Sequence, residues 1–397
     1  MKMNINGRSF VLSSFLLAFL LATCLFLPNR TSAKTVTSNP IFSWQNKLVS
    51  EEPSVVEPRP EVAHGGGKVG IVWDDNRTGN YEMYFALLDN KGNKIGENLK
   101  VTNDTGSSRD PVISWNGESF GIFWFDNPSG FGSGIYFAQI SDEGTLSIPP
   151  TRINPASSVG DHPSAVWNQR ADEYGLVWRD SRNEGAYFAR ISRDGSVIKE
   201  TPVALMATVR PLIATSGKEY ALTWTEWYTC GTSCPEVSLA RLNKKGDLIG
   251  EIKQITFTGG NVPLSIDWNG KGYGLLVGKG NTALFMSLSP SGDILQQETD
   301  LGNISASNAK LVWGNNRYGV TWTDGRWVTS EYPLNGEVAF QTFDRSGNSL
   351  SEVERVSNGT GPSWNSSTPI VIGNRFALAW VENLNQGDQA IYFAQGR

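Results

Sequence analysis

The chain has 397 residues, of which 39% are hydrophobic and 18% are charged, a composition typical of a globular protein. Two histidines and three cysteines are too few for a histidine-rich metal site, a four-cysteine zinc module or an iron–sulfur scaffold. The net charge of −5 argues against a surface that binds nucleic acid. We therefore expect no metal, no cofactor and no nucleic-acid partner.

The N-terminal segment has the features of a secretory signal peptide. A positively charged start precedes an apolar run, Phe10–Leu27, and small residues follow at 31–33. We expect cleavage after residue 33, a linker over 34–44, and a secreted, periplasmic or cell-surface protein with no later membrane span. An uncleaved membrane anchor is the alternative. Lipoprotein processing at Cys24 fits less well, because a threonine precedes that cysteine.

A four-residue pattern recurs along the rest of the chain about every 50 residues. It begins with Gly or Ala, continues with two residues that are mostly apolar, and in most copies ends in Trp. Its last position falls at Trp73, Trp124, Trp178, Trp224, Val277, Trp322 and Trp380.

Further features share this period and complete the repeat. A Pro-led segment precedes the pattern in most copies, as in 111–117. An aromatic segment such as Tyr84–Ala86 follows it, and then a Gly-containing turn such as that at Gly92. Each repeat thus holds four short strands, which we call a to d from the axis outward. Four-stranded repeats arranged radially form a β-propeller, so the sequence predicts an all-β fold with seven blades.

The last repeat ends after its strand c, and its strand d is missing from the C-terminus. The segment 47–50 has the pattern of that strand and comes from the N-terminus. A strand shared between the two ends would close the ring and remove two open sheet edges. We therefore expect a single propeller domain over 45–397 with this velcro closure. Six or eight blades remain the alternative, because the fifth and sixth repeats are weak.

The run from Trp73 to Arg77, followed by Tyr84–Ala86 and Gly92, resembles the W-x-D-x-R repeats of secreted bacterial propeller proteins. In a looser sense it is similar to the sialidase-like propellers, although the full Asp-box pattern does not occur. The resemblance covers residues 45–397 and implies the fold. It leaves the function open, because propellers serve as binding proteins, lyases and hydrolases alike.

The acidic and basic residues that follow the strand-b Trp recur from blade to blade. A side chain repeated in six blades is expected to stabilise the turn between strands b and c rather than to catalyse a reaction. His64 and His162 have no ligand-type neighbour in sequence, so we expect structural roles for them too. The repeat residues are Asp75, Arg77, Asp126, Asp180, Arg182, Glu226, Asp324, Arg326 and Glu382.

Aromatic residues outside the repeat positions are better candidates for ligand binding. The connections b–c and d–a emerge on the same face of a propeller, and the b–c connections of blades four and six are long while that of blade five is short. Exposed rings there would line a groove for a sugar face or a peptide. The alternative is that they cover apolar surface of their own loops. These residues are Trp227, Tyr228, Trp327, Tyr332 and Trp364.

The function we predict is therefore that of an exported, monomeric binding or scaffolding protein without catalysis, with a glycan or a protein as its ligand. Cys230 and Cys234 are expected to form a disulfide that stiffens the loop beside Trp227. The alternative is a glycoside hydrolase or lyase that uses Glu331 or Glu236 with a repeat carboxylate on the same face.

Overall fold

The computed structural model describes residues 44–50, 58–103, 105–128, 132–204, 207–229, 233–306, 308–327, 336–358, 361–384 and 388–396. Within these ranges the side chains of residues 207–209, 228–229, 233, 303 and 327 are not described. The predicted signal peptide and nearly all of the predicted linker lie outside the described residues, so both stay predictions.

The described strands form seven antiparallel sheets, and in six of them four strands follow one another in chain order. The first three blades contain β2 (Glu61–Gly65), β3 (Lys68–Asp75), β4 (Glu82–Asp89) and β5 (Lys94–Lys100); β6 (Ser108–Trp115), β7 (Ser119–Asp126), β8 (Gly134–Ser141) and β9 (Leu146–Arg152); and β10 (Gly160–Asn168), β11 (Glu173–Asp180), β12 (Gly185–Ser192) and β13 (Val197–Ala204).

Blades four to six follow the same order. They contain β14 (Ala207–Thr215), β15 (Glu219–Thr229), β16 (Ser233–Asn243) and β17 (Lys253–Gln254); β18 (Asn261–Trp268), β19 (Tyr273–Lys279), β20 (Thr282–Leu288) and β21 (Ile294–Ser305); and β22 (Lys310–Gly314), β23 (Arg317–Asp324), the 3₁₀ turn η1 (Gly325–Trp327), β24 (Glu337–Phe343) and β25 (Glu354–Arg355).

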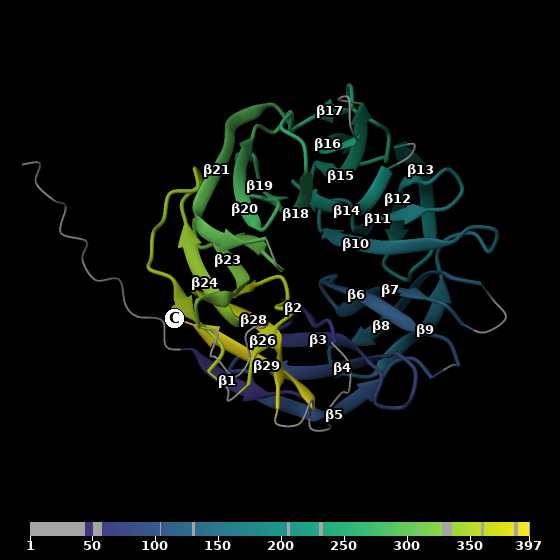
Figure 1. Ribbon diagram of the computed structural model, residues 1–397. Helices are drawn as coiled ribbons and strands as arrows, with labels where there is room; N and C mark the ends of the chain where they lie inside the picture. Colours follow the sequence, from purple (N-terminus) through teal and green to yellow (C-terminus); the bar gives the residue numbers. More distant parts are fainter. Residues whose placement is uncertain are drawn as a thin grey trace, which may run out of the picture. The chain divides into compact units, whose positions relative to one another are not determined.

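The seventh blade joins the two ends of the domain. Its strands are β26 (Ser363–Trp364) and β27 (Ile370–Ile372), which both pair with β28 (Arg375–Asn383), then β29 (Gln389–Gly396) and, on the outside, β1 (Gln45–Leu48). The innermost strands contact those of neighbouring blades around the ring, and β27 contacts β2 (Figure 1). The prediction of an all-β, seven-bladed propeller is confirmed.

The velcro closure is also confirmed. Strand β1 pairs antiparallel with β29, from Gln45 opposite Gln395 to Leu48 opposite Tyr392. Val49 continues the ladder, because its N–H donates to the carbonyl of Ile391 at 2.8 Å. The N-terminal strand therefore covers an edge that the last blade would otherwise expose.

The core lies between blades, which explains the four-residue pattern. The six Trp residues of that pattern are fully buried. Its first position must be small because an aromatic ring of the next blade lies against it: a Cβ added at Gly121 would be 2.3 Å from the hydroxyl of Tyr174, and one at Gly274 would be 2.3 Å from that of Tyr318. Each Gly thus lets the next blade approach closely.

Candidate ligand-binding face

The repeat carboxylates hold the buried Trp rings in place. In five blades the carboxylate two residues after the strand-b Trp accepts the indole N–H of that Trp, at 2.6 to 3.1 Å. All five carboxylates are buried. The pairs are Trp73–Asp75, Trp124–Asp126, Trp178–Asp180, Trp322–Asp324 and Trp380–Glu382.

In three blades an arginine completes this arrangement. Arg182 donates from Nε to Asp180 at 2.8 Å, and its guanidinium lies 3.9 Å from the ring centre of Tyr187 on strand c. A planar cation between a carboxylate and an aromatic face stabilises the turn from both sides. This geometry supports a structural role for the W-x-D-x-R residues. The same ion pair joins Arg77 to Asp75 and Arg326 to Asp324.

Blade four departs from this pattern. Glu226 accepts a hydrogen bond from the hydroxyl of Ser238 at 2.8 Å. The indole nitrogen of Trp224 is buried and has no hydrogen-bond partner within the described ranges. Blade four is also the blade in which strands b and c extend furthest toward the face.

Strands β15 and β16 form a long hairpin that carries the first predicted binding residue. The ladder continues past Glu226, with Trp227 opposite Pro235 and Tyr228 opposite Cys234. Trp227 is 49% exposed, the largest value among the Trp residues whose side chains are described. Most of the predicted loop thus consists of two paired β-strands, and the exposed Trp227 is carried on regular structure.

The structure places the other predicted aromatic residues differently. Trp364 lies in β26, paired with Val381, and packs half-buried against the core between blades seven and one. The expectation that Trp364 lies in the connection into blade seven is therefore wrong. Trp327 is the last residue of η1, and its side chain is not described. Tyr332, like the alternative acid Glu331 and the predicted disulfide partner Cys230, lies outside the described residues.

The second candidate acid, Glu236, belongs to a buried hydrogen-bond network. It accepts hydrogen bonds from the hydroxyl of Thr256 at 2.5 Å, the backbone N–H of Gly259 at 2.6 Å and the amide of Asn261 at 2.8 Å. The oxygens of this buried carboxylate already accept three hydrogen bonds, and these bonds join strand c to the connection that follows strand d. The geometry supports no catalytic role for it.

A group of polar residues that the sequence reasoning missed lies where the innermost strands begin. Asp110, His162 and Arg210 each directly precede a proline, and the strand pairing shifts at each of these positions. Each forms a β-bulge with its proline, an irregularity that redirects side chains and is frequent beside functional sites. Arg59 holds the corresponding place before Pro60 in blade one. We call Arg59, Asp110, His162 and Arg210 the mouth residues.

The backbone at the three bulges is left-handed. The φ angles are 55° at Asp110, 49° at His162 and 38° at Arg210. Residues before proline favour extended conformations, and a left-handed Arg is particularly uncommon. Local strain of this kind, on the order of 1–3 kcal/mol per residue, is concentrated at binding and catalytic sites.

The mouth residues contact one another across blades. Arg59 forms an ion pair with Asp110, and the other oxygen of Asp110 lies 3.6 Å from Nδ1 of His162. Arg210 is exposed and interacts electrostatically with both Arg59 and His162. Four consecutive blades thus bring a polar cluster together at the axis.

Burial shifts the pKa values of three groups near the mouth, the carboxyl groups of Asp74 and Asp161 and the imidazole of His162. Asp74 is fully buried and accepts the backbone N–H of Arg59 at 2.6 Å, and burial raises its pKa to about 6 although Arg59 and Arg109 oppose the shift. Burial likewise raises the pKa of Asp161. Burial lowers the pKa of His162, Asp161 opposes that shift, and Arg210 adds to it, which favours a neutral imidazole at pH 7.

The innermost strands of different blades are also joined below the mouth. Lys310 of blade six reaches Glu61 of blade one with an Nζ–Oε1 distance of 2.5 Å. A hollow of about 410 Å³ lies among the innermost strands, and His64, Trp115, Trp167 and Asp267 help to line it. Both oxygens of Asp267 accept backbone N–H groups, from Trp268 and Trp313, so this carboxylate joins blades five and six.

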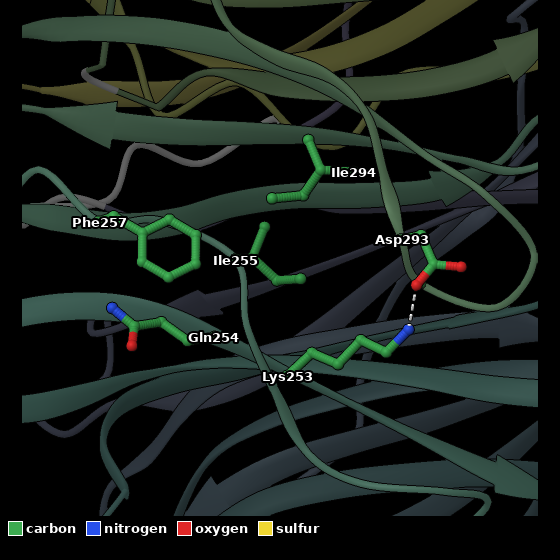
Figure 2. A pocket seen from close by; sticks show the side chains of 7 residues that line it. Lys253, Gln254, Ile255, Phe257, Asp293 and Ile294 are labelled. Atoms are coloured by element: carbon green, nitrogen blue, oxygen red, sulfur yellow. Dashed lines mark hydrogen bonds and ion pairs between the residues drawn. The ribbon is translucent and has the colours of Figure 1, made fainter.

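A second groove lies on the outer rim, between the outer strand of blade four and a turn of blade five. Figure 2 shows the side chains of Ile255, Phe257 and Ile294 along it and the ion pair between Lys253 and Asp293. Phe257 is 62% exposed. Few polar groups converge here, so the rim groove is a weaker candidate for specific recognition than the mouth.

Two further observations concern the described part of the chain. Within it, no group of three or more His, Cys, Asp or Glu side chains is arranged to hold a metal ion. No helix there is long and apolar enough to cross a membrane.

One sequence signal would have located the mouth. Most repeats carry a proline near the start of the innermost strand, and the residue before it is Arg59, Asp110, His162 or Arg210 in blades one to four. A charged or titratable residue at a repeat position whose identity changes from blade to blade cannot serve a common packing role. The proline marks the repeat, and the residue before it marks the mouth.

Comparisons with known proteins support the fold and leave the function open. No protein-family model and no curated protein matches the chain. Among solved structures, a protein of unknown function from Dyadobacter fermentans has a TM-score of 0.56 at 10% identity, covering 90% of this chain and all of that one.

Two further structures are similar. The β-propeller domain of the Trilobed protease from Pyrococcus furiosus, which has an open velcro topology, has a TM-score of 0.53 at 9% identity and covers 85% of this chain and 95% of that one. The α-L-arabinofuranosidase Arb93A from Fusarium graminearum has a TM-score of 0.51 at 13% identity, and the match covers 75% of this chain and 97% of that one. At such low identity, what this chain shares with these proteins is the propeller fold.

Proposed function

We propose that the chain is an exported, non-catalytic binding protein that recognises a glycan on the face formed by the b–c and d–a connections. One observation carries this proposal: Trp227 is half-exposed on the paired strands of blade four, the same blade that contributes Arg210 to the polar cluster at the mouth. Aromatic faces bind the apolar faces of sugar rings, and planar polar groups match their hydroxyls.

The register of blade four supports a single continuous site. Val209 pairs with Thr225, and Trp227 follows Thr225 by two positions on the same strand. Arg210 is one residue further from Trp227, because the two strands are antiparallel. The two residues are therefore separated by about three residues of extended chain, or roughly 10 Å along the strands. A short oligosaccharide can contact both.

The carboxylates described on this face favour binding over hydrolysis. The repeat carboxylates accept hydrogen bonds from buried Trp rings, Glu236 is saturated, and Asp74 is fully buried. Asp110 and Asp161 are the carboxylates near the mouth that reach solvent, and each lies beside an arginine, Asp110 beside Arg59 and Asp161 beside Arg179. An arginine partner stabilises the ionised form of a carboxyl group, which disfavours the protonated acid that glycoside hydrolysis requires.

A glycan array probed with the purified protein tests the proposal, and hydrolysis and elimination assays on every bound glycan accompany it. We expect binding without turnover, and a loss of affinity of thirtyfold or more in Trp227→Ala, about 2 kcal/mol. Phe257→Ala, which removes an exposed ring from the rim groove, is the matched control and should bind normally. Turnover of a bound glycan would establish the enzymatic alternative. Binding that is unchanged in Trp227→Ala, or that is seen only with peptides, would refute the proposal.

A further inference from the structure

We propose that Trp44 and Glu354 form a latch that holds the N-terminal strand β1 closed at mildly acidic pH and loosens it above neutrality. The latch concerns the closure of the ring and is independent of any ligand on the binding face. Three features of the molecule support it: the contacts of β1 with the adjacent blades, the packing of the Trp44 ring, and the burial of the carboxyl group that this ring covers.

Strand β1 bridges three blades although it is only four residues long. Its backbone pairs with β29 of blade seven, and successive side chains of a strand point to opposite sides. Lys47 donates to Asn93 in a turn of blade one, whereas Asn46 donates to Asn358 in the connection that follows blade six. Trp44, directly before the strand, lies on the same side as Asn46 and contacts blade six. The strand is thus held from both sides.

The ring of Trp44 packs between blades six and seven. It lies edge-on to Phe340 in strand c of blade six, with ring centres 5.1 Å apart. On the side of blade seven, a Cβ added at Gly396 would be 2.9 Å from the ring, so this glycine makes room for it. The outer strands β5, β9, β13, β17, β21 and β25 contain no Trp. Trp44 is therefore a feature of the closing strand and not of the repeat.

The same ring reaches a carboxyl group of the adjacent blade. The indole N–H of Trp44 donates to Oε2 of Glu354 at 3.0 Å. Glu354 lies in β25, the outer strand of blade six, directly opposite Phe340. Burial raises the pKa of this carboxyl to about 7, although the hydrogen bond from Trp44 and the charge of Arg317 oppose the shift. The closing strand is thus held against a group whose charge changes near neutral pH.

The charged groups around Glu354 leave it sensitive to burial. Among the described cations, Arg317 at the start of β23 is the one whose charge acts on this carboxyl. Arg355, the next residue in β25, pairs with Glu337 of β24 instead. Lys47 of β1 points to blade one, and β29 has no charged residue. The cover provided by Trp44 is therefore coupled to the protonation of Glu354.

This coupling has a definite sign. Opening of β1 returns the Glu354 carboxyl to water, where the ordinary pKa of a glutamic acid is about 4.3. A carboxyl whose pKa is higher in the closed state than in the open state stabilises the closed state while it is protonated. That contribution is present at low pH and is lost as the pH rises through 7. Loosening of the latch then exposes the edge of β29 to pairing by another strand.

Hydrogen exchange of the closing strand tests the latch. The backbone amides of residues 45–49 are followed by mass spectrometry at pH 6 and pH 8 in the unmodified protein and in Glu354→Gln. Comparison at the same pH cancels the pH dependence of the exchange chemistry. We expect the ratio of the two exchange rates, unmodified protein over variant, to rise about tenfold from pH 6 to pH 8. The amides of β3 report on global unfolding and should show no such rise.

Two further variants assign the effect to the contact between Trp44 and Glu354. Glu352→Gln alters an exposed carboxyl two positions away and should behave like the unmodified protein. Trp44→Ala removes the ring that covers the carboxyl. Adding Glu354→Gln to Trp44→Ala should therefore leave the exchange of β1 unchanged at both pH values.

Three outcomes would overturn the latch. The first is an exchange ratio that stays the same from pH 6 to pH 8. The second is an equal rise in β3, because β1 would then open only together with the whole ring. The third is an effect of Glu354→Gln that persists in the Trp44→Ala protein, because the carboxyl would then act without the ring.

Discussion

The hydroxyl of Ser50 accepts the backbone N–H of Ile391 at 2.8 Å, although the two residues are 341 positions apart. The same contact occurs in three other blades at 2.9 Å, where a Thr or Ser at the end of strand d accepts an N–H of strand c. These contacts join Thr102 to Met83, Thr256 to Val237 and Ser357 to Val338. Ser50 therefore occupies the place of a strand-d residue in blade seven, and the N-terminal strand closes the ring with the contact used elsewhere.

Deleting residues 44–50 should abolish cooperative unfolding of the propeller. The deletion removes β1 and the buried side chain of Val49, and it exposes an edge of β29. We expect aggregation and dye binding to exposed apolar surface, measured against a control that lacks only residues 34–43. A shortened protein that melts at the temperature of the control would contradict velcro closure.

The disulfide between Cys230 and Cys234 remains a prediction. It would close a very short loop at the end of the β15–β16 hairpin, so its contribution should fall at the low end of the typical range, about 2 kcal/mol. Thiol labelling of unreduced protein recovered from an oxidising compartment measures it directly. Two reactive thiols per chain would rule the disulfide out, and one or none is expected if the pair has formed.

The sequence was sufficient for the fold because the fold is repeated. The Trp of strand b, the small residue three positions before it and the turn glycines occur in several copies. A strand that is ambiguous in one repeat can therefore be assigned by comparison with the same strand in the other repeats. The mouth cluster has no such redundancy. Asp110, His162 and Arg210 share a position and differ in chemistry, and their proximity depends on the ring geometry that brings the innermost strands together at the axis.

Trp364 is a residue for which the sequence predicts a binding role and the structure shows a packing role. It stands outside the repeat pattern, which suggested an exposed ring, and yet it packs against the core between blades seven and one. The innermost strand of blade seven is split into β26 and β27, so the segment before β27 returns to the sheet instead of remaining a connection. A departure from sequence periodicity can thus reflect a local change in the strand as well as a binding role.

The stability of the protein should fall as the pH rises from about 5 to 8. Glu382 is buried, and burial raises its pKa to about 7, with Glu337 nearby adding to the shift. A carboxyl whose pKa is higher in the folded than in the unfolded chain stabilises the fold while it is protonated. That contribution is lost as the pH passes through 7.

Glu382→Gln tests this dependence, because the amide imitates the protonated acid and can still accept the indole N–H of Trp380. Thermal unfolding measured between pH 5 and 8 should show a shallower decline for the variant, by about 1–3 kcal/mol over the range. Asp293→Asn is a control, since an exposed ion pair with Lys253 lowers the pKa of that carboxyl to about 2, well below the range tested. Equal slopes for Glu382→Gln and the unmodified protein would contradict the assignment.

The two kinds of Trp should respond to truncation in opposite ways. Trp178 is fully buried, donates to Asp180 at 2.8 Å and lies beside Tyr187, with ring centres 6.0 Å apart. Trp178→Ala leaves a cavity and removes the indole donor to Asp180, which keeps its ion pair with Arg182, so the substitution should cost about 3–5 kcal/mol of unfolding free energy, mostly through the cavity. Trp227 is 49% exposed on the hairpin, and Trp227→Ala should change stability by less than about 1 kcal/mol. Denaturant unfolding of both variants, followed by circular dichroism, makes the comparison. If Trp227→Ala destabilised the protein as much as Trp178→Ala, the exposed ring would be a packing residue, and the glycan site would lose the aromatic surface on which it depends.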